Sequence, residues 1–160
     1  EPQSRYETRV ECVLVWLKQQ ALLDTWDQSF IDWFIVFEQG DMQYWWAKYL
    51  QPGFRHCYAV RWDGFNWIGY YPHLGHTDID VLNFGKYDSI LNVVANTDCS
   101  AILYLKVWRD SKRIRAPWPT VSTCVEQVKA ILGVRKWFLF TAWQLFNYLE
   151  KQNGRIIQQT

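Results

Sequence analysis

The sequence predicts an α+β fold, with an antiparallel sheet in the middle of the chain packed against helices near its end. Residues from His56 to Trp62 divide with a period of two into a face of larger side chains and a face with Cys57, Ala59 and Arg61, which is typical of a strand with two different faces. Asp63-Gly64 follows at once and is a strong hairpin signal. Two capping boxes, beginning at Thr123 and Thr141, indicate helices after the strands.

The chain length indicates a single domain. A chain of 160 residues can bury roughly two-thirds of the surface that its unfolded form exposes. We find no internal repeat and no linker-like stretch. We therefore predict one domain over residues 1–160, made of a helical, aromatic-rich region at 1–53 and an α+β core at 54–154.

The region before the core is predicted to be helical. Ser4-x-x-Glu7 has the pattern of a capping box before apolar residues at helical spacing. The aromatic-rich stretch Phe30–Phe37 is also predicted to be a helix. A short helix, Met42–Leu50, should then stop at Pro52-Gly53.

Strands dominate the middle of the chain. Phe65–Pro72 is the return strand of the hairpin, and His76–Phe84 is a possible third strand. Ala101–Trp108 is another, turned by Asp110-Ser111 into residues 112–115. Within His56–Trp62 the alternation predicts one face with His56, Tyr58, Val60 and Trp62, and an opposite face with Cys57, Ala59 and Arg61.

Two helices complete the core. The helix that opens at Thr123 should run to about Leu132, with Gly133 as its C-terminal stop. The helix that opens at Thr141 should run to about Gly154. The polar tail Arg155–Thr160 is predicted to be loose.

Composition excludes several classes of function. The net charge of +1 gives no overall field that would attract nucleic acid or anionic lipid. The apolar run Val13–Leu17 is far shorter than the ~18 to 20 residues of a membrane span, and no other run approaches that length. A basic cluster surrounds the hairpin predicted after Ala101–Trp108, and a solvated hairpin explains it better than a nucleic-acid groove: Lys106, Arg109, Lys112, Arg113 and Arg115.

Aromatic and cysteine content adds two further expectations. Eleven tryptophans are best explained by a core of large rings and by contacts with neighbouring chains; a saccharide-stacking surface is the alternative. The four cysteines, at 12, 57, 99 and 124, show no metal-ligand spacing, so we expect neither structural zinc nor a cofactor.

Cys124 is the first candidate for chemistry. If Thr123 caps the helix, Cys124 lies at its first position, where unpaired amide groups and the helix dipole stabilise a thiolate. His56 is the candidate base, because it opens a strand and a thiolate needs a proton shuttle. Amide groups at the helix start could form an oxyanion hole. The alternative is a buried structural cysteine beside an unrelated histidine.

Cys57 is the rival nucleophile, but adjacent residues of a strand face opposite ways, so we predict that Cys57 fills the core.

A third residue would orient the imidazole. If the turn spans Asp63–Asn66, His56 lies opposite His73; a tighter turn would place Tyr71 there, and the sequence does not fix the register. The candidates for this role are, in order, His73, His76 and Asp78.

The residues from 54 to about 150 carry a family resemblance. They resemble small phage and prophage proteins related to the circularly permuted NlpC-type, papain-like cysteine hydrolases, in which a histidine-bearing strand precedes the cysteine-bearing helix. His56 likewise precedes Cys124, and the first fifty residues carry no such likeness. The likeness rests on Phe54-Arg55-His56-Cys57, Trp67-Ile68, Pro72, Cys124-Val125-Glu126-Gln127-Val128-Lys129, Leu132-Gly133 and Thr141-Ala142-Trp143-Gln144-Leu145.

The resemblance implies a permuted papain-like fold and a cysteine peptidase or amidase with Cys124 and His56 as its pair and His73 as third member. For a phage-type protein it implies the peptide part of peptidoglycan as substrate. It also implies other virion proteins as partners, and a location in the virion, the host cytoplasm or the cell envelope. The alternative is a catalytically silent tail or baseplate protein. Nucleic-acid binding by the hairpin near Lys106 is the least favoured function.

Overall fold

The computed structural model describes residues 30–40, 45–73, 76–82, 99–108, 123–152 and 154–159. The helix predicted after Ser4 and the segment predicted at residues 109–119 lie outside these ranges. The described elements, in chain order, are β1 (Phe30–Glu38), the 3-10 helix η1 (Trp45–Tyr49), β2 (His56–Trp62), β3 (Trp67–Pro72), β4 (Thr77–Leu82), β5 (Cys99–Trp108), α3 (Cys124–Leu132), α4 (Ala142–Lys151) and β6 (Arg155–Gln159).

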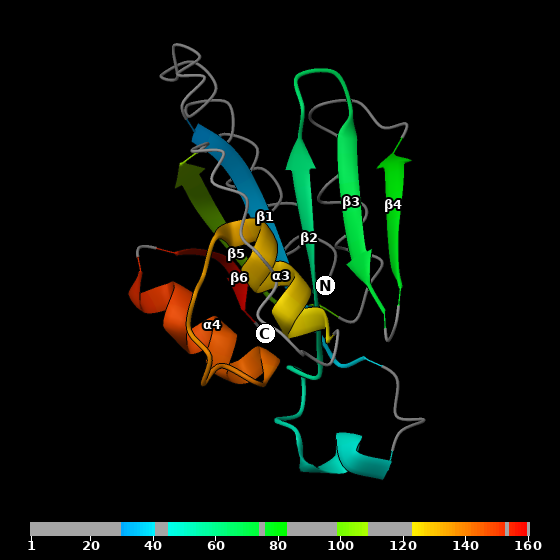
Figure 1. Cartoon of the computed structure of the whole chain (residues 1–160), viewed down its shortest axis with the longest axis vertical. Helices are drawn as coiled ribbons and strands as arrows, with labels where there is room; N and C mark the ends of the chain where they lie inside the picture. The colour runs from blue at the N-terminus through cyan, green and yellow to red at the C-terminus, as the bar shows by residue number, and fades with distance from the viewer. Residues whose placement is uncertain are drawn as a thin grey trace, which may run out of the picture.

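The strands form one antiparallel sheet, six-stranded within the described residues, in the order β4-β3-β2-β1-β5-β6. The two described helices, α3 and α4, lie together on one face of this sheet (Figure 1). The predicted α+β class, with an antiparallel sheet against a cysteine-bearing helix, is confirmed at this level.

The hairpin β2–β3 follows the wider of the two predicted turns. Trp62 pairs with Trp67, and the Asp63 carboxylate accepts from the amides of Phe65 and Asn66 at 2.8 and 2.7 Å. This turn therefore sets the register that brings His56 toward His73, rather than the register that would bring Tyr71 there.

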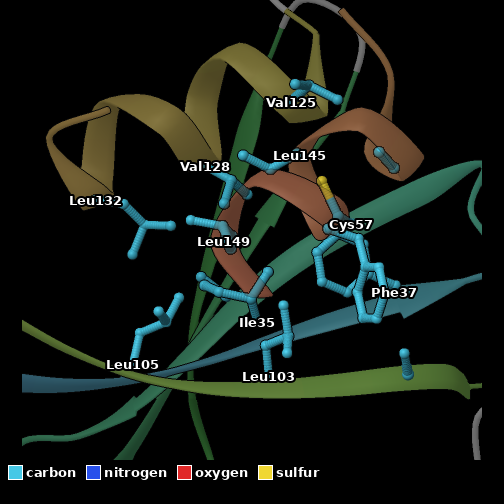
Figure 2. Close-up of a cluster of buried hydrophobic side chains, with 14 of the residues drawn as sticks. Ile35, Phe37, Cys57, Leu103, Leu105, Val125, Val128, Leu132, Leu145 and Leu149 are labelled. Atoms are coloured by element: carbon cyan, nitrogen blue, oxygen red, sulfur yellow. The ribbon is translucent and has the colours of Figure 1, made fainter. Parts of the chain in front are cut away.

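Side chains alternate between two buried clusters, one on each face of the sheet. Cys57, Ala59 and Ile35 belong to the cluster beneath the helices, together with Val128 and Leu145 (Figure 2). The cluster on the other face contains Phe34, Val36, Tyr58, Val60, Trp67, Cys99 and Ile102. The alternation predicted for His56–Trp62 is confirmed.

Both predicted caps are present. The Thr123 and Thr141 hydroxyls each accept from the third amide of their helix, and Gly133 ends α3 in the left-handed conformation at φ 72°. Lys129 is almost fully buried; it donates to the Glu126 carboxylate at 2.6 Å and to the Leu139 carbonyl at 3.3 Å, and so ties α3 to the following loop.

Two predictions were wrong. Phe30–Phe37, predicted to be helical, is the strand β1 between β2 and β5. Its aromatic and β-branched side chains fit a sheet buried on both faces, which hides the period-2 signal. The boundary predicted at residue 53, between a helical region and an α+β core, therefore separates β1 from β2, although both strands belong to the same sheet. The tail, predicted to be loose, forms β6 and pairs with β5 through residues such as Ile156 opposite Leu103.

The short helix predicted at 42–50 is confirmed over Trp45–Tyr49, where it is a 3-10 helix. No helix in the described part of the chain is both long enough and apolar enough to cross a bilayer.

Candidate active site

Cys124 is the first residue of α3, as predicted. Thr123 before it is extended, at φ −93° and ψ 161°, and its hydroxyl accepts from the Glu126 amide at 3.2 Å. The Cys124 side chain is partly buried and packs against the cluster beneath the helices. The thiol therefore lies at the positive end of the helix dipole, where a thiolate is stabilised.

The start of α3 is fastened to the turn between β3 and β4. The side-chain Nε2 of Gln127 donates to the His73 carbonyl at 3.2 Å, and the Thr77 hydroxyl donates to the Gln127 side-chain oxygen. Because β3 pairs with β2, this anchor brings the first turn of α3 to the end of the sheet where β2 begins.

His56 is the first residue of β2 and is partly buried. Its ring lies near-parallel to that of His73, with 6.3 Å between centroids, and 6.5 Å from that of Tyr58. Gly40, at φ 66°, lies against it, since a β-carbon there would come within 2.9 Å of the His56 β-carbon. Only a glycine at this position leaves the histidine in place without strain.

His56 and Cys124 interact through a side-chain hydrogen bond. Burial by itself would lower the pKa of His56, but the hydrogen bond to Cys124, the Cys124 charge and the Glu38 charge outweigh burial and raise it. The structure thus brings together His56 and Cys124, the two predicted candidates, which lie about seventy positions apart in the sequence.

The pKa of Cys124 falls to about 4. The largest cause is a side-chain hydrogen bond from Cys57; burial opposes it, and the hydrogen bond and charge of His56 lower the pKa further, as does the Cys57 amide. A pKa this low makes the sulfur a thiolate at neutral pH, and the raised pKa of the adjacent His56 favours its protonated form beside that thiolate.

Cys57 plays a part that the sequence analysis did not foresee. Its side chain is fully buried beneath the helices, as predicted, with the sulfur directed toward them (Figure 2). However, α3 covers this same face, so Cys57 meets Cys124 instead of lying away from the site. The pKa of Cys57 rises well above its ordinary value because it hydrogen-bonds Cys124 and is buried, so its S–H stays a donor.

Glu38 is a second residue that the sequence analysis missed. It ends β1 directly opposite His56, and its charge contributes to the raised pKa of His56. This placement could not be predicted while Phe30–Phe37 was expected to be a helix, because a helix there would not pair with β2. The available signal was a run of β-branched and aromatic residues closed by a carboxylate.

The three candidates for the third position gather at the β3–β4 turn. His73 Nε2 lies 3.4 Å from Asp78 Oδ2, and His76 Nε2 lies 4.0 Å from the same oxygen. Of the three, His73 is the one whose ring stacks near His56. Two groups therefore lie close to the His56 imidazole: Glu38, whose charge raises its pKa, and His73, whose ring stacks near it.

A pocket of about 270 Å³ adjoins His56 on the face opposite the helices. This volume suits a side chain or another small group, since pockets for drug-sized ligands begin near 300 Å³. It is lined by Glu38, His56, Tyr58, Tyr71, His73, Asp78 and Asp80.

Comparisons of this chain with protein-family models, with curated proteins and with solved structures found no match.

Proposed function

We propose that this chain is a thiol hydrolase in which Cys124 is the nucleophile and His56 the proton shuttle. The observation that carries the proposal is the hydrogen-bonded Cys124–His56 pair at the start of a capped helix. A lowered thiol pKa and an adjacent imidazole are the two requirements of cysteine nucleophilic catalysis.

We further propose that the fold is the permuted papain-like one. The support is the chain order, a histidine on strand β2 before a cysteine that begins α3, together with the packing of α3 over β2 and β3. The resemblance of residues 54 to about 150 to the NlpC-type hydrolases points the same way.

In the proposed reaction, the Cys124 sulfur attacks an amide carbonyl and forms a tetrahedral intermediate. Amide groups at the start of α3 stabilise its oxyanion. The imidazolium of His56 gives its proton to the leaving nitrogen, which departs as an amine and leaves a thioester on Cys124. Water, deprotonated by His56, then attacks the thioester; the acid is released and the thiolate returns.

We propose the peptide part of bacterial peptidoglycan as the substrate, and the virion, host cytoplasm or cell envelope as the location. This rests on the resemblance to phage and prophage proteins. The pocket beside His56 is large enough for one side chain or chain end, but Cys124 is not among its described lining residues, so the resemblance alone carries the peptide substrate.

Iodoacetamide labelling of Cys124, followed by mass spectrometry of its peptide, tests the pair. We expect labelling of the native protein to be fast and nearly independent of pH between about 5.5 and 8, because the thiolate is already formed. His56→Ala removes a hydrogen bond and a charge that lower the pKa of Cys124, so labelling at pH 6 should slow, by about tenfold if the new pKa is about 7.

Buried Cys57 and Cys99 in the same digest serve as internal controls for unfolding. Labelling of Cys124 no faster than that of a free thiol in the native protein would overturn the proposed pair. Release of soluble peptides from purified peptidoglycan, lost in Cys124→Ala, would then test the substrate separately.

Exposed aromatics favour a second candidate function, that of a virion structural module. Trp137 is 80% exposed and Phe140 is 63% exposed in the loop between α3 and α4, where Phe138 joins them. Exposed rings of this kind are typical of protein interfaces. This function predicts recovery of the protein in purified particles, and a loss of that recovery in Trp137→Ser but not in Phe65→Ser, since Phe65 is as exposed but lies on the β2–β3 turn.

A further inference from the structure

The turn between β3 and β4 gathers two imidazoles and a carboxylate at one point. The nitrogens of His73 and His76 and an oxygen of Asp78 lie within 4.8 Å of one another. All three side chains are exposed, so an ion could reach them from solvent.

The spacing of these atoms fits a small divalent ion. Zn–N and Zn–O bonds of about 2.0 to 2.2 Å with tetrahedral angles place neighbouring ligand atoms roughly 3.3 Å apart. The observed separations are 3.4 Å from His73 Nε2 to Asp78 Oδ2 and 4.0 Å from His76 Nε2 to the same oxygen. Small rotations of exposed side chains are enough to close the remaining difference.

The backbone that carries the three ligands is held in place. The His73 amide donates to the His76 carbonyl at 2.9 Å, and Asp78 pairs with Tyr71 across the strands. Gln127 of α3 bonds both sides of this turn, at the His73 carbonyl and the Thr77 hydroxyl. The described backbone at His73, His76 and Asp78 is therefore held before an ion binds.

The surroundings favour a cation. The adjoining pocket contains the carboxylates of Glu38, Asp78 and Asp80, and no lysine or arginine is among its described lining residues.

We propose that His73, His76 and Asp78 form a binding site for a borderline divalent transition metal such as Zn²⁺. Two imidazoles select this class over Mg²⁺ and Ca²⁺, which prefer oxygen ligands alone. Three protein ligands leave a fourth position for water or for a group of a bound molecule. The site does not depend on the proposed thiol chemistry.

Calorimetric titration with Zn²⁺ of protein previously stripped with a chelator tests the site. We expect one ion per chain, with affinity lowered at least about tenfold by His76→Ala and by Asp78→Asn, since even loss of an outer-shell partner costs about 10- to 100-fold. Asp80→Asn is the matched control: Asp80 is exposed on the same strand and lines the same pocket but is not among the three ligands. It should change the affinity less than about twofold.

Cobalt absorption spectra distinguish this site from the thiols. With Co²⁺ we expect visible ligand-field bands and no sulfur-to-metal charge-transfer band, in the native protein and in Cys124→Ser alike. Zn²⁺ affinity that is unchanged in both His76→Ala and Asp78→Asn, or that is lost in Cys124→Ser, would overturn the proposal. Slow labelling of Cys124, by contrast, would overturn only the proposed hydrolase.

Discussion

The reactivity of Cys124 depends on a neighbour that stands next to the candidate base in the sequence. Cys57 donates the hydrogen bond that contributes most to the low pKa of Cys124. Cys57→Ala removes this donor, so the pKa of Cys124 should rise and its labelling by iodoacetamide at pH 6 should slow, by about tenfold if the new pKa is about 7. Cys57→Ser keeps a donor at the same place and should restore most of the rate.

Cys99→Ala is the matched control for that experiment. Cys99 is also a buried free cysteine, with its pKa raised to about 12 chiefly by burial, but it belongs to the cluster on the other face of the sheet. Its replacement should lower stability without slowing the labelling of Cys124. Equal slowing in both variants would show that loss of packing, and not loss of the donor, is responsible.

The Cys124–His56 pair should also shape the pH dependence of stability. Between pH 4 and about 6.5 the unfolded chain binds a proton at both groups, whereas the folded pair binds one, so stability should rise with pH by at most about 1.4 kcal/mol per unit. The raised pKa of His56 contributes stability that is complete below about pH 6.5 and is lost as the pH rises through the folded value of that pKa. The difference in unfolding free energy between the native protein and Cys124→Ser, measured by urea titration across pH 4 to 9, should increase from pH 4 to about 6.5. A difference that does not vary with pH would contradict the ion pair.

At the scale of elements, the end of β1 positions the base. Gly40 has a positive φ, and a β-carbon added to it would lie 2.9 Å from the His56 β-carbon. Gly40→Ala should cost about 1 to 2 kcal/mol of stability from backbone strain alone, and it should also displace His56 and slow the labelling of Cys124.

Gly53→Ala separates these two effects. Gly53 also has a positive φ, of 79°, and a β-carbon there would meet the Ser100 hydroxyl and not His56. Thermal unfolding should show similar destabilisation for both variants, whereas Cys124 labelling should slow only in Gly40→Ala. Slowing in both would mean that labelling reports general loosening of the fold.

At the scale of the whole molecule, the chain end closes one side of the sheet. β6 pairs with β5 through Ala101, Ile102, Leu103 and Tyr104, so deletion of residues 155–160 would leave β5 with an unpaired edge. We expect this deletion to lower the unfolding free energy by at least about 1 kcal/mol, or roughly 3 °C in melting temperature, and to promote aggregation on heating.

Two isoleucines in β6 provide the finer comparison. Ile157 is partly buried against the cluster that contains Phe34, whereas Ile156 is 37% exposed. Ile157→Ala should cost more stability than Ile156→Ala because it removes more buried apolar area. A protein lacking residues 155–160 that is as stable as the full chain would contradict the pairing of β6 with β5.

The sequence by itself determined the features that arise within a few residues. The cap at Thr123, the helix stop at Gly133, the hairpin at Asp63-Gly64 and the alternation from His56 are all local, because each depends on hydrogen bonds or spacing between near neighbours. This is why Cys124 at a helix start and His56 at a strand start could be predicted as candidates.

The tertiary structure alone decided what requires segments far apart in the chain. β1 is a strand because it is buried on both faces between β2 and β5, and a doubly buried strand loses the alternation that would reveal it. Glu38 therefore lies opposite His56 because β1 pairs with β2. Cys57 lies beside Cys124 because α3 packs over the sheet. Strand pairing and helix docking are set by the total burial of the fold, and no local pattern encodes them.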